Sequence, residues 1–368
     1  MTSPTRRRTL LGLGSTLAAG MFGVTAAASA QATDTAETEQ ETTDSAAADS
    51  AAVSAKVDVH SHYLTSTYRQ ALIDSGNSQP DGMSSIPDWS PEGALQLMTT
   101  TGVAHAMLSI SSPGISLGDA AANQRLARSV NEEGAQIVGD NPTRFGLLAS
   151  LPLPDVEAAI AEARYALDQL KADGIALETN YHGVYLSDEQ FDPLMAELHE
   201  RQAVVLLHPT SPACFEETSF GRPRPMIEFL FDTTRTVTEL VLRGVMDKYP
   251  DIRFIIPHAG AALPVLADRI AAFALEGQVD INVMDAFRRL HYDVAGFSAT
   301  RAVPALLKIT DSQHLLYGSD YPFTSAPVVT AQALALEVGG ALTPSQKEQM
   351  FSLNALELFP RLAQAPVA

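Results

Sequence analysis

Two histidines one residue apart, His60 and His62, have the spacing in this chain that most directly indicates chemistry. They end the short apolar segment Val57-Asp-Val-His-Ser-His62. Successive side chains of a β-strand point to opposite faces, so both imidazoles are expected on one face. Asp58 would share that face, while Val57 and Val59 would point the other way, under the helices. Imidazoles at this spacing can bind one divalent ion, although a pair of structural histidines is the alternative.

Further polar side chains stand where other apolar segments end. His208 and His258 close two such segments, Asp320 follows the last one, and Glu178 and Asn180 close an earlier one. In a (β/α)₈ barrel the carboxyl ends of the strands meet at one rim, where active sites are built. One histidine after an apolar segment is usually structural, but several ligand-type side chains at one rim predict a metal-dependent site.

The elements that position these residues alternate along the chain. Short apolar segments are separated by helix-like stretches such as 156–170, 191–201 and 234–248, the first with clear helical periodicity. This alternation predicts an α/β fold of the (β/α)₈ TIM-barrel type. A doubly wound open sheet is the alternative, but no glycine-rich phosphate loop follows a strand. The expected strands are 57–60, 104–110, 145–150, 174–178, 203–208, 253–258, 290–294 and 315–318.

The segment before the barrel has the features of an export signal. Three arginines (6–8) precede an apolar run that ends in Ala28-Ser29-Ala30, a small-x-small cleavage site. Residues 1–30 are therefore predicted to be a twin-arginine signal, which implies a periplasmic or extracellular protein. An uncleaved anchor is the alternative, but the Gly, Ser and Thr content favours removal and no stable membrane insertion. Residues 31–55 are predicted to be a disordered acidic Ala/Thr/Ser linker, and 56–368 the barrel.

The net charge and the cysteine content limit the classes of function that this chain can have. The formal net charge of −19 argues against a nucleic-acid partner. The single cysteine, Cys214, excludes an intramolecular disulfide. That is expected of a protein that folds and acquires its metal in the cytoplasm before export.

Four segments resemble the decarboxylase branch of the amidohydrolase superfamily, which includes aminocarboxymuconate semialdehyde, γ-resorcylate and 6-methylsalicylate decarboxylases. They are Val57–His62, Val205–Pro209, Tyr249–Gly260 and Leu316–Phe323. Two shorter stretches, Phe231–Arg235 and Ser111–Gly114, are similar to the 6-methylsalicylate decarboxylases. The resemblance spans essentially the whole expected barrel.

The resemblance implies that His60, His62, His208 and Asp320 bind one divalent metal ion, with zinc favoured and manganese the other candidate. Relatives with two metals usually bridge them with a carbamylated lysine ending strand four. Here that strand ends in Glu178, so one metal is expected, with a Glu178 carboxylate bridge as the alternative. His258 and Asp320 are the candidate catalytic residues, either of which would donate the proton.

The resemblance also suggests residues that contact substrate. Arg269 would bind a substrate carboxylate, across a subunit interface in some relatives, which favours a homodimer. Phe323 would pack on the substrate ring, and Asn180 is a third candidate. Ala261 stands where γ-resorcylate decarboxylases carry a glutamate, which disfavours a dihydroxybenzoate substrate.

The function predicted from these residues is metal-dependent, non-oxidative decarboxylation of a small aromatic or unsaturated carboxylic acid, of the 6-methylsalicylate type. A hydrolase of a lactone or amide with the same ligands is the main alternative, because fold and ligand set are shared. A metal-binding protein without turnover is the third hypothesis. No further cofactor is expected, since no dinucleotide or Walker motif is present.

Overall fold

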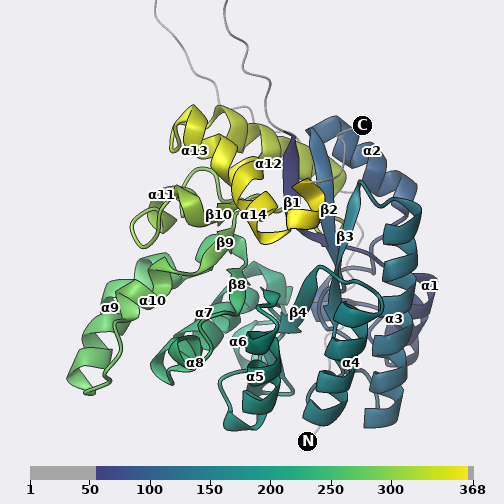
Figure 1. Cartoon of the computed structure of the whole chain (residues 1–368), viewed down its shortest axis with the longest axis horizontal. Helices are drawn as coiled ribbons and strands as arrows, with labels where there is room; N and C mark the ends of the chain where they lie inside the picture. Colours follow the sequence, from purple (N-terminus) through teal and green to yellow (C-terminus); the bar gives the residue numbers. More distant parts are fainter. Residues whose placement is uncertain (1–54, 364–368) are drawn as a thin grey trace, which may run out of the picture. The chain divides into compact units, whose positions relative to one another are not determined.

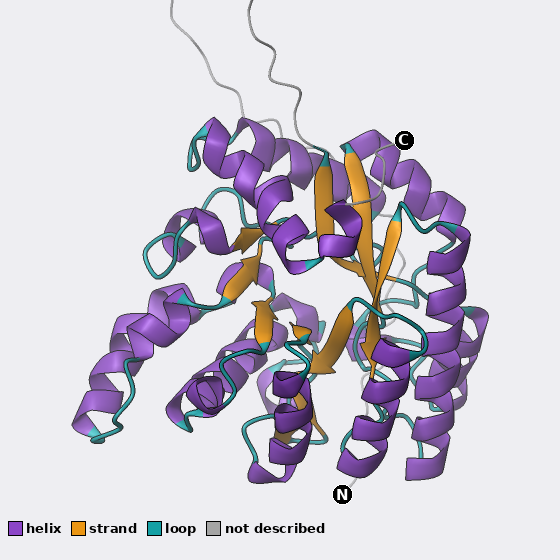
Figure 2. Ribbon diagram, viewed as in Figure 1, coloured by secondary structure: helices purple, strands orange, loops and turns teal. Residues whose placement is uncertain are grey.

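The computed structural model describes residues 55–363, whose helices lie outside a ring of strands (Figures 1 and 2). The predicted export signal and nearly all of the predicted linker lie outside the described residues. Within the described range, none of the helices has both the length and the apolar character needed for a bilayer crossing.

Eight parallel strands form the sheet in the order β1-β2-β3-β4-β7-β8-β9-β10. Backbone hydrogen bonds from Val59 N to Tyr317 O and from His62 N to Tyr321 O join the first strand to the segment after the last. The sheet thereby closes on itself, as the alternating pattern predicts. The strands are β1 Lys56–His62, β2 Val103–Ser109, β3 Phe145–Ser150, β4 Gly174–Glu178, β7 Val204–His208, β8 Arg253–Ile256, β9 His291–Asp293 and β10 Leu315–Leu316; β5 Asn180–Tyr181 and β6 Val184–Tyr185 form a separate hairpin.

The helices begin and end at the residues that favour caps. The side chain of Ser90 caps the second helix ahead of Pro91, and Gly102, with φ 71°, ends it. The helix expected over 234–248 is two helices, because Gly244 has a φ of 72° between them. The helices are α1 Ser66–Asp74, α2 Pro91–Thr101, α3 Ala120–Asp140, α4 Val156–Asp168, α5 Asp192–Glu200, α6 Phe215–Thr218, α7 Glu228–Leu242, α8 Val245–Lys248, α9 Leu263–Glu276, α10 Val283–Arg288, α11 Ala302–Leu306, α12 Ala326–Val338, α13 Pro344–Glu348, α14 Asn354–Leu358 and α15 Pro360–Ala363.

The core has two parts, as expected of a barrel. The larger part packs the outer faces of the strands against the surrounding helices. The smaller part lies inside the barrel, where one or two side chains from most strands meet residues of α14 and α15. These helices close the end of the barrel opposite the carboxyl ends of the strands, so the metal-ligand candidates lie at the open end.

The side-chain parity predicted for β1 is wrong. Val57 and Val59 belong to the inner cluster and do not pack under helices. Asp58 lies instead with residues of α2 and α12, on the outer face. The pairing register of β1 with β2 shifts between Asp58 and Ser61, and a bulge of this kind reverses which side a strand residue faces. Because of this bulge, Val57 and Val59 before it and His60 and His62 after it all point into the barrel.

Candidate metal centre

The four predicted ligands converge on one point at the open end of the barrel. One ligand atom from each of His60, His62, His208 and Asp320 lies within 4.8 Å of the other three. His62 Nε2 is 3.1 Å and His60 Nε2 is 3.6 Å from Asp320 Oδ1. Among the residues that the structure describes, no other group of His, Cys, Asp or Glu side chains has this geometry. Glu178 is not part of it, which supports a single ion over a bridged pair.

Each candidate histidine has a polar neighbour on the side away from the centre, hydrogen-bonded in the case of His60 and His62. The His60 Nδ1 atom lies 2.9 Å from Asp293 Oδ2, and His62 Nδ1 lies 3.1 Å from Ser109 Oγ. His208 Nδ1 lies 3.5 Å from Glu178 Oε2, within ion-pair distance but without a hydrogen bond between them. Such contacts fix the tautomer and the ring orientation of metal-binding histidines.

A buried ring nitrogen without a hydrogen-bond partner and the set of donor atoms both indicate that this centre can bind a cation. His60 Nε2 is buried without a hydrogen-bond partner, while its other ring nitrogen is paired. A buried nitrogen left in this way carries a desolvation cost that a metal ion would remove. Three imidazoles and one carboxylate are a donor set typical of zinc and related divalent ions.

The pKa shifts agree with this fit. Burial alone would raise the pKa of Asp320, but the nearby His258 imidazole, a hydrogen bond from His62 and the charge of His60 hold it well below its usual value. Burial, followed by the charges of His62 and His60, lowers the pKa of His208 well below the usual value. Two conditions for metal binding are thus met, since the carboxylate is ionised and this imidazole is neutral.

His60 shows that the centre favours a positive charge. Burial would lower its pKa, but the charge and hydrogen bond of Asp293, with the charges of Asp320 and Asp58, outweigh it and raise the pKa to about 9. A divalent cation at this point would supply that positive charge in place of the proton.

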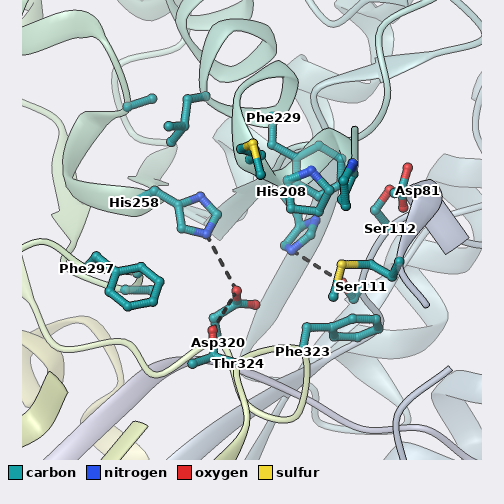
Figure 3. Close-up of a pocket in the computed structure, with 18 of the residues that line it drawn as sticks. Asp81, Ser111, Ser112, His208, Phe229, His258, Phe297, Asp320, Phe323 and Thr324 are labelled. Carbon is teal, nitrogen blue, oxygen red and sulfur yellow. Dashed lines mark hydrogen bonds and ion pairs between the residues drawn. The ribbon is translucent and has the colours of Figure 1, made fainter. Parts of the chain in front are cut away.

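His258 stands beside the centre without belonging to it. Its Nε2 lies 3.8 Å from Asp320 Oδ2 (Figure 3). The backbone N–H of His258 donates to Asp293 Oδ1 over 3.0 Å. The φ of His258 is 55°, in the left-handed region, and the next three residues also have positive φ values. Residues other than glycine seldom adopt positive φ values, and such strained positions cluster at functional sites. Here the run carries the histidine to the edge of the cavity.

A cavity of about 560 Å³ opens over the centre, a volume typical of small-molecule sites. His208, His258 and Asp320 lie at its base (Figure 3). Among the described residues, its lining contains neither lysine nor arginine. The remaining lining residues, most of them apolar, are Pro80, Asp81, Met83, Ser111, Ser112, Pro223, Pro225, Met226, Phe229, Leu230, Ala261, Ala295, Gly296, Phe297, Ser298, Ala302, Phe323 and Thr324.

The three predicted substrate contacts have different positions. Phe323 lines the cavity and packs edge-on against His62, with ring centroids 5.5 Å apart. Asn180 does not line it, because its amide donates to Asp232 Oδ2 and its oxygen accepts from Gly183 N. Arg269 is exposed on α9, over the ring of Phe273 in a separate groove. Its predicted role across a subunit interface stays a prediction, as does substrate contact by the other two.

Sequence reasoning missed Asp293, which holds two parts of the site together. One carboxylate oxygen contacts His60, and the other accepts from the backbone N–H groups of His258 and Ala295. The signal was present, since Asp293 lies near the end of a predicted strand, where the other site residues were found. Asp58 has a similar backbone role, because it accepts hydrogen bonds from His60 N and Ser319 N across the β1–β10 seam.

Comparison with known proteins agrees with this geometry. The amidohydrolase family profile matches residues 57–361. The chain is 36% identical over 325 residues to the 6-methylsalicylic acid decarboxylase of Aspergillus aculeatus, covering 84% of this chain and 97% of that protein. The crystal structure of an amidohydrolase II superposes with a TM-score of 0.80 at 36% identity, covering 83% of this chain and 99% of that one.

A more distant structure shares the fold. The dihydroxybenzoic acid decarboxylase of a Polaromonas species, solved with bound manganese, superposes with a TM-score of 0.73 at 22% identity, covering 83% of this chain and 96% of that one. The barrel, the four converging ligands and the similarity over nearly the whole described chain lead to one conclusion: this protein belongs to the amidohydrolase family, in the branch of its decarboxylases.

Proposed function

We propose that this protein is a metal-dependent decarboxylase that converts a small aromatic acid of the 6-methylsalicylate type into the corresponding arene and CO₂. The observation that carries the proposal is the four-ligand centre at the base of a mostly apolar cavity, with His258 beside it. The similarity to the decarboxylase of Aspergillus aculeatus supports the choice of reaction and of substrate class.

His60, His62, His208 and Asp320 would hold the ion, and we propose zinc, with manganese as the other candidate. When bound, the cation supplies the positive charge that holds the substrate carboxylate or a neighbouring hydroxyl and stabilises negative charge on the ring. That anchor is needed because no lysine or arginine of the described residues lines the cavity. Phe323 and the other apolar side chains would pack on the ring and exclude water.

The reaction replaces one C–C bond with one C–H bond. A proton is delivered to the ring carbon that carries the carboxylate. The bond between this carbon and the carboxylate carbon then breaks, CO₂ leaves, and the electron pair of the broken bond returns to the ring. His258 and Asp320 are the groups of this chain that face the cavity near the centre. Asp320, held ionised, would keep a proton on His258 in position.

The reaction is tested by incubating the metal-loaded protein with 6-methylsalicylate while recording CO₂ and the arene. The same preparation is given an aromatic lactone, and acid formation is recorded. Metal-dependent CO₂ release with no lactone opening supports the proposal. Lactone opening without CO₂ release would replace it with the hydrolase alternative.

We also propose that residues 1–30 direct export by the twin-arginine route and that the mature protein works outside the cytoplasm. The support is the arginine cluster, the apolar run and the cleavage-like Ala28-Ser29-Ala30. Replacing Arg6 and Arg7 with lysine should retain the full-length precursor in the cells. Export of the lysine variant at the normal rate would contradict the twin-arginine assignment.

A further inference from the structure

Helix α7 carries the stretch Phe231–Arg235, to which neither the metal centre nor the cavity lining gives a role. Its two end residues are exposed, whereas the three between them, Asp232, Thr233 and Thr234, are buried. Buried polar side chains cost free energy unless they find partners. The partners of Asp232 and Thr234 lie in two different segments beside the site.

Asp232 attaches α7 to the segments on the His208 side. One carboxylate oxygen accepts from the amide of Asn180 over 2.8 Å and from the hydroxyl of Thr179, and the other accepts from Tyr185 OH over 2.6 Å. The backbone N–H of Thr179 donates in turn to His208 O over 2.8 Å. Three donors on one fully buried carboxylate hold this part of the helix firmly beside a candidate metal ligand.

Thr234 attaches the same helix to the turn on the His258 side. Its Oγ1 accepts from the backbone N–H of Ala262 over 3.1 Å and donates to Leu230 O over 2.8 Å. Ala262 directly follows the run of four positive φ values that begins at His258. At the start of that run, the N–H of His258 donates to Asp293 Oδ1. A side-chain oxygen therefore holds the strained run at each of its ends.

The imidazole of His258 depends on this backbone for its position. Its Nε2 lies 3.8 Å from Asp320 Oδ2, longer than a hydrogen bond, and its Nδ1 is buried without a hydrogen-bond partner. His60 and His62, by contrast, are each hydrogen-bonded at Nδ1. Figure 3 shows the ring of His258 pointing towards Asp320. A ring that no side chain holds by a hydrogen bond moves with the turn that carries it.

We infer that Thr234 is a positioning residue for His258, because its hydroxyl holds the far end of the strained run and so keeps the imidazole directed at the cavity. The inference rests on the proposed function, in which His258 faces the substrate. Three of the four residues of the run are not glycine and favour negative φ. Without the acceptor at Thr234 the run can relax, and the ring of His258 would turn away from Asp320.

Helix α7 is suited to this task because it contacts both sides of the site. Phe229, near its start, lines the cavity and packs against His208, with ring centroids 6.3 Å apart. Asp232 holds the segment next to His208, and Thr234 holds the turn of His258. The helix thereby sets the spacing between His258 and the metal centre.

The test compares substitutions in α7 of the zinc-loaded protein with 6-methylsalicylate as substrate. Thr234→Val keeps a similar shape and removes the oxygen. It should lower kcat about 10- to 100-fold, the effect of a misplaced catalytic group, with KM and zinc affinity little changed. Thr234→Ser retains the hydroxyl and should recover most of kcat. Thr233→Val is the matched control, because Thr233 is equally buried and its hydroxyl has no hydrogen-bond partner among the described residues. This control should leave kcat unchanged.

Hydrogen–deuterium exchange of the metal-free protein gives a readout that does not depend on activity. Thr234→Val should speed exchange in residues 258–262 relative to both the wild type and Thr233→Val. Unchanged kcat or unchanged exchange in Thr234→Val overturns the inference. An equal loss of kcat in Thr234→Ser, or a matching loss of zinc affinity in Thr234→Val, also overturns it, because the role would then be a general structural one. If the proposed function fails, the wild-type protein releases no CO₂, whereas the exchange comparison still decides whether Thr234 holds the turn.

Discussion

The replacement Asp293→Asn separates two tasks that one carboxylate performs. One oxygen contacts His60 Nδ1 over 2.9 Å, and the other accepts from the N–H groups of His258 and Ala295, each over 3.0 Å. An asparagine keeps an acceptor for the two backbone N–H groups. It places an NH₂ donor opposite the imidazole, which then must accept at Nδ1 and carry its hydrogen on Nε2. Nε2 is the atom that faces the metal centre, so the tautomer that the variant favours cannot bind metal.

The expected loss follows from the buried contact that is removed. Losing the partner of a metal-binding histidine typically lowers metal affinity about 10- to 100-fold, or about 1.4–2.7 kcal/mol. Asp293 is fully buried, so no water replaces it, and the loss should lie at the upper end. Zinc affinity is measured by competition with a chelator. In parallel, the stabilisation that saturating zinc adds to the protein in urea unfolding should fall by a similar free energy.

Asp293→Ala serves as the comparison, because it removes both tasks at once. It should lower metal affinity and also loosen the turn that carries His258. For Asp293→Asn, the circular dichroism of the metal-free protein should match the wild type. An Asp293→Asn variant that binds zinc with wild-type affinity would refute the view that this carboxylate fixes the tautomer of His60.

Three further substitutions probe other parts of the account. His258→Asn should keep the metal, because His258 is not among the four ligands, and should lower kcat for decarboxylation about 100-fold or more; near-normal turnover would remove this histidine from the reaction. His291, at the opposite end of the barrel, has a pKa lowered to about 4 by burial and then by the charges of neighbouring His314 and Arg253. The stability that the neutral His291 contributes is present above about pH 6.5 and is lost as the pH falls towards 4. At pH 5, His291→Gln should therefore lose about 2 kcal/mol less of its free energy of unfolding than the wild-type protein does. Equal acid sensitivity of the two proteins in urea unfolding would contradict this. In Gly318→Ala the new Cβ would lie 2.8 Å from His60 Cβ, whereas in the control Gly139→Ala it would meet nothing within 4 Å. Only Gly318→Ala should lose stability, by about 1–3 kcal/mol, and only Gly318→Ala should bind zinc more weakly. If Gly318→Ala binds zinc as tightly as the control, the close approach of Gly318 to His60 is not needed.

Local sequence patterns were sufficient to predict much of this fold. The strands over 145–150 and 174–178 were predicted with the bounds that the structure has, because each is a short buried apolar run with clear ends. The four residues that converge at the candidate metal centre were found from the same pattern, together with the family resemblance, since each follows or ends such a run. The carboxyl ends of parallel strands meet at one rim, so position in the strand predicts position in space.

Features that depend on distant contacts could not be predicted in this way. The bulge in β1 reverses its parity and is set by pairing with neighbouring strands. The amide of Asn180 donates a hydrogen bond to Asp232, 52 residues later in the chain. Asp81 comes to the cavity from a loop that contacts Ser211, 130 residues away. Neither partner is signalled by the residues next to it in the chain.

The most direct test of the account is a titration of the metal-free protein with zinc, and separately with manganese, while CO₂ release from 6-methylsalicylate is measured. Activity should be absent at the start, rise linearly with added metal and reach its plateau at one equivalent per chain. Substitution of His60, His62 or His208 by alanine should abolish the rise. Full activity without metal, or a plateau at two equivalents, would contradict a reaction that depends on one cation held by His60, His62, His208 and Asp320.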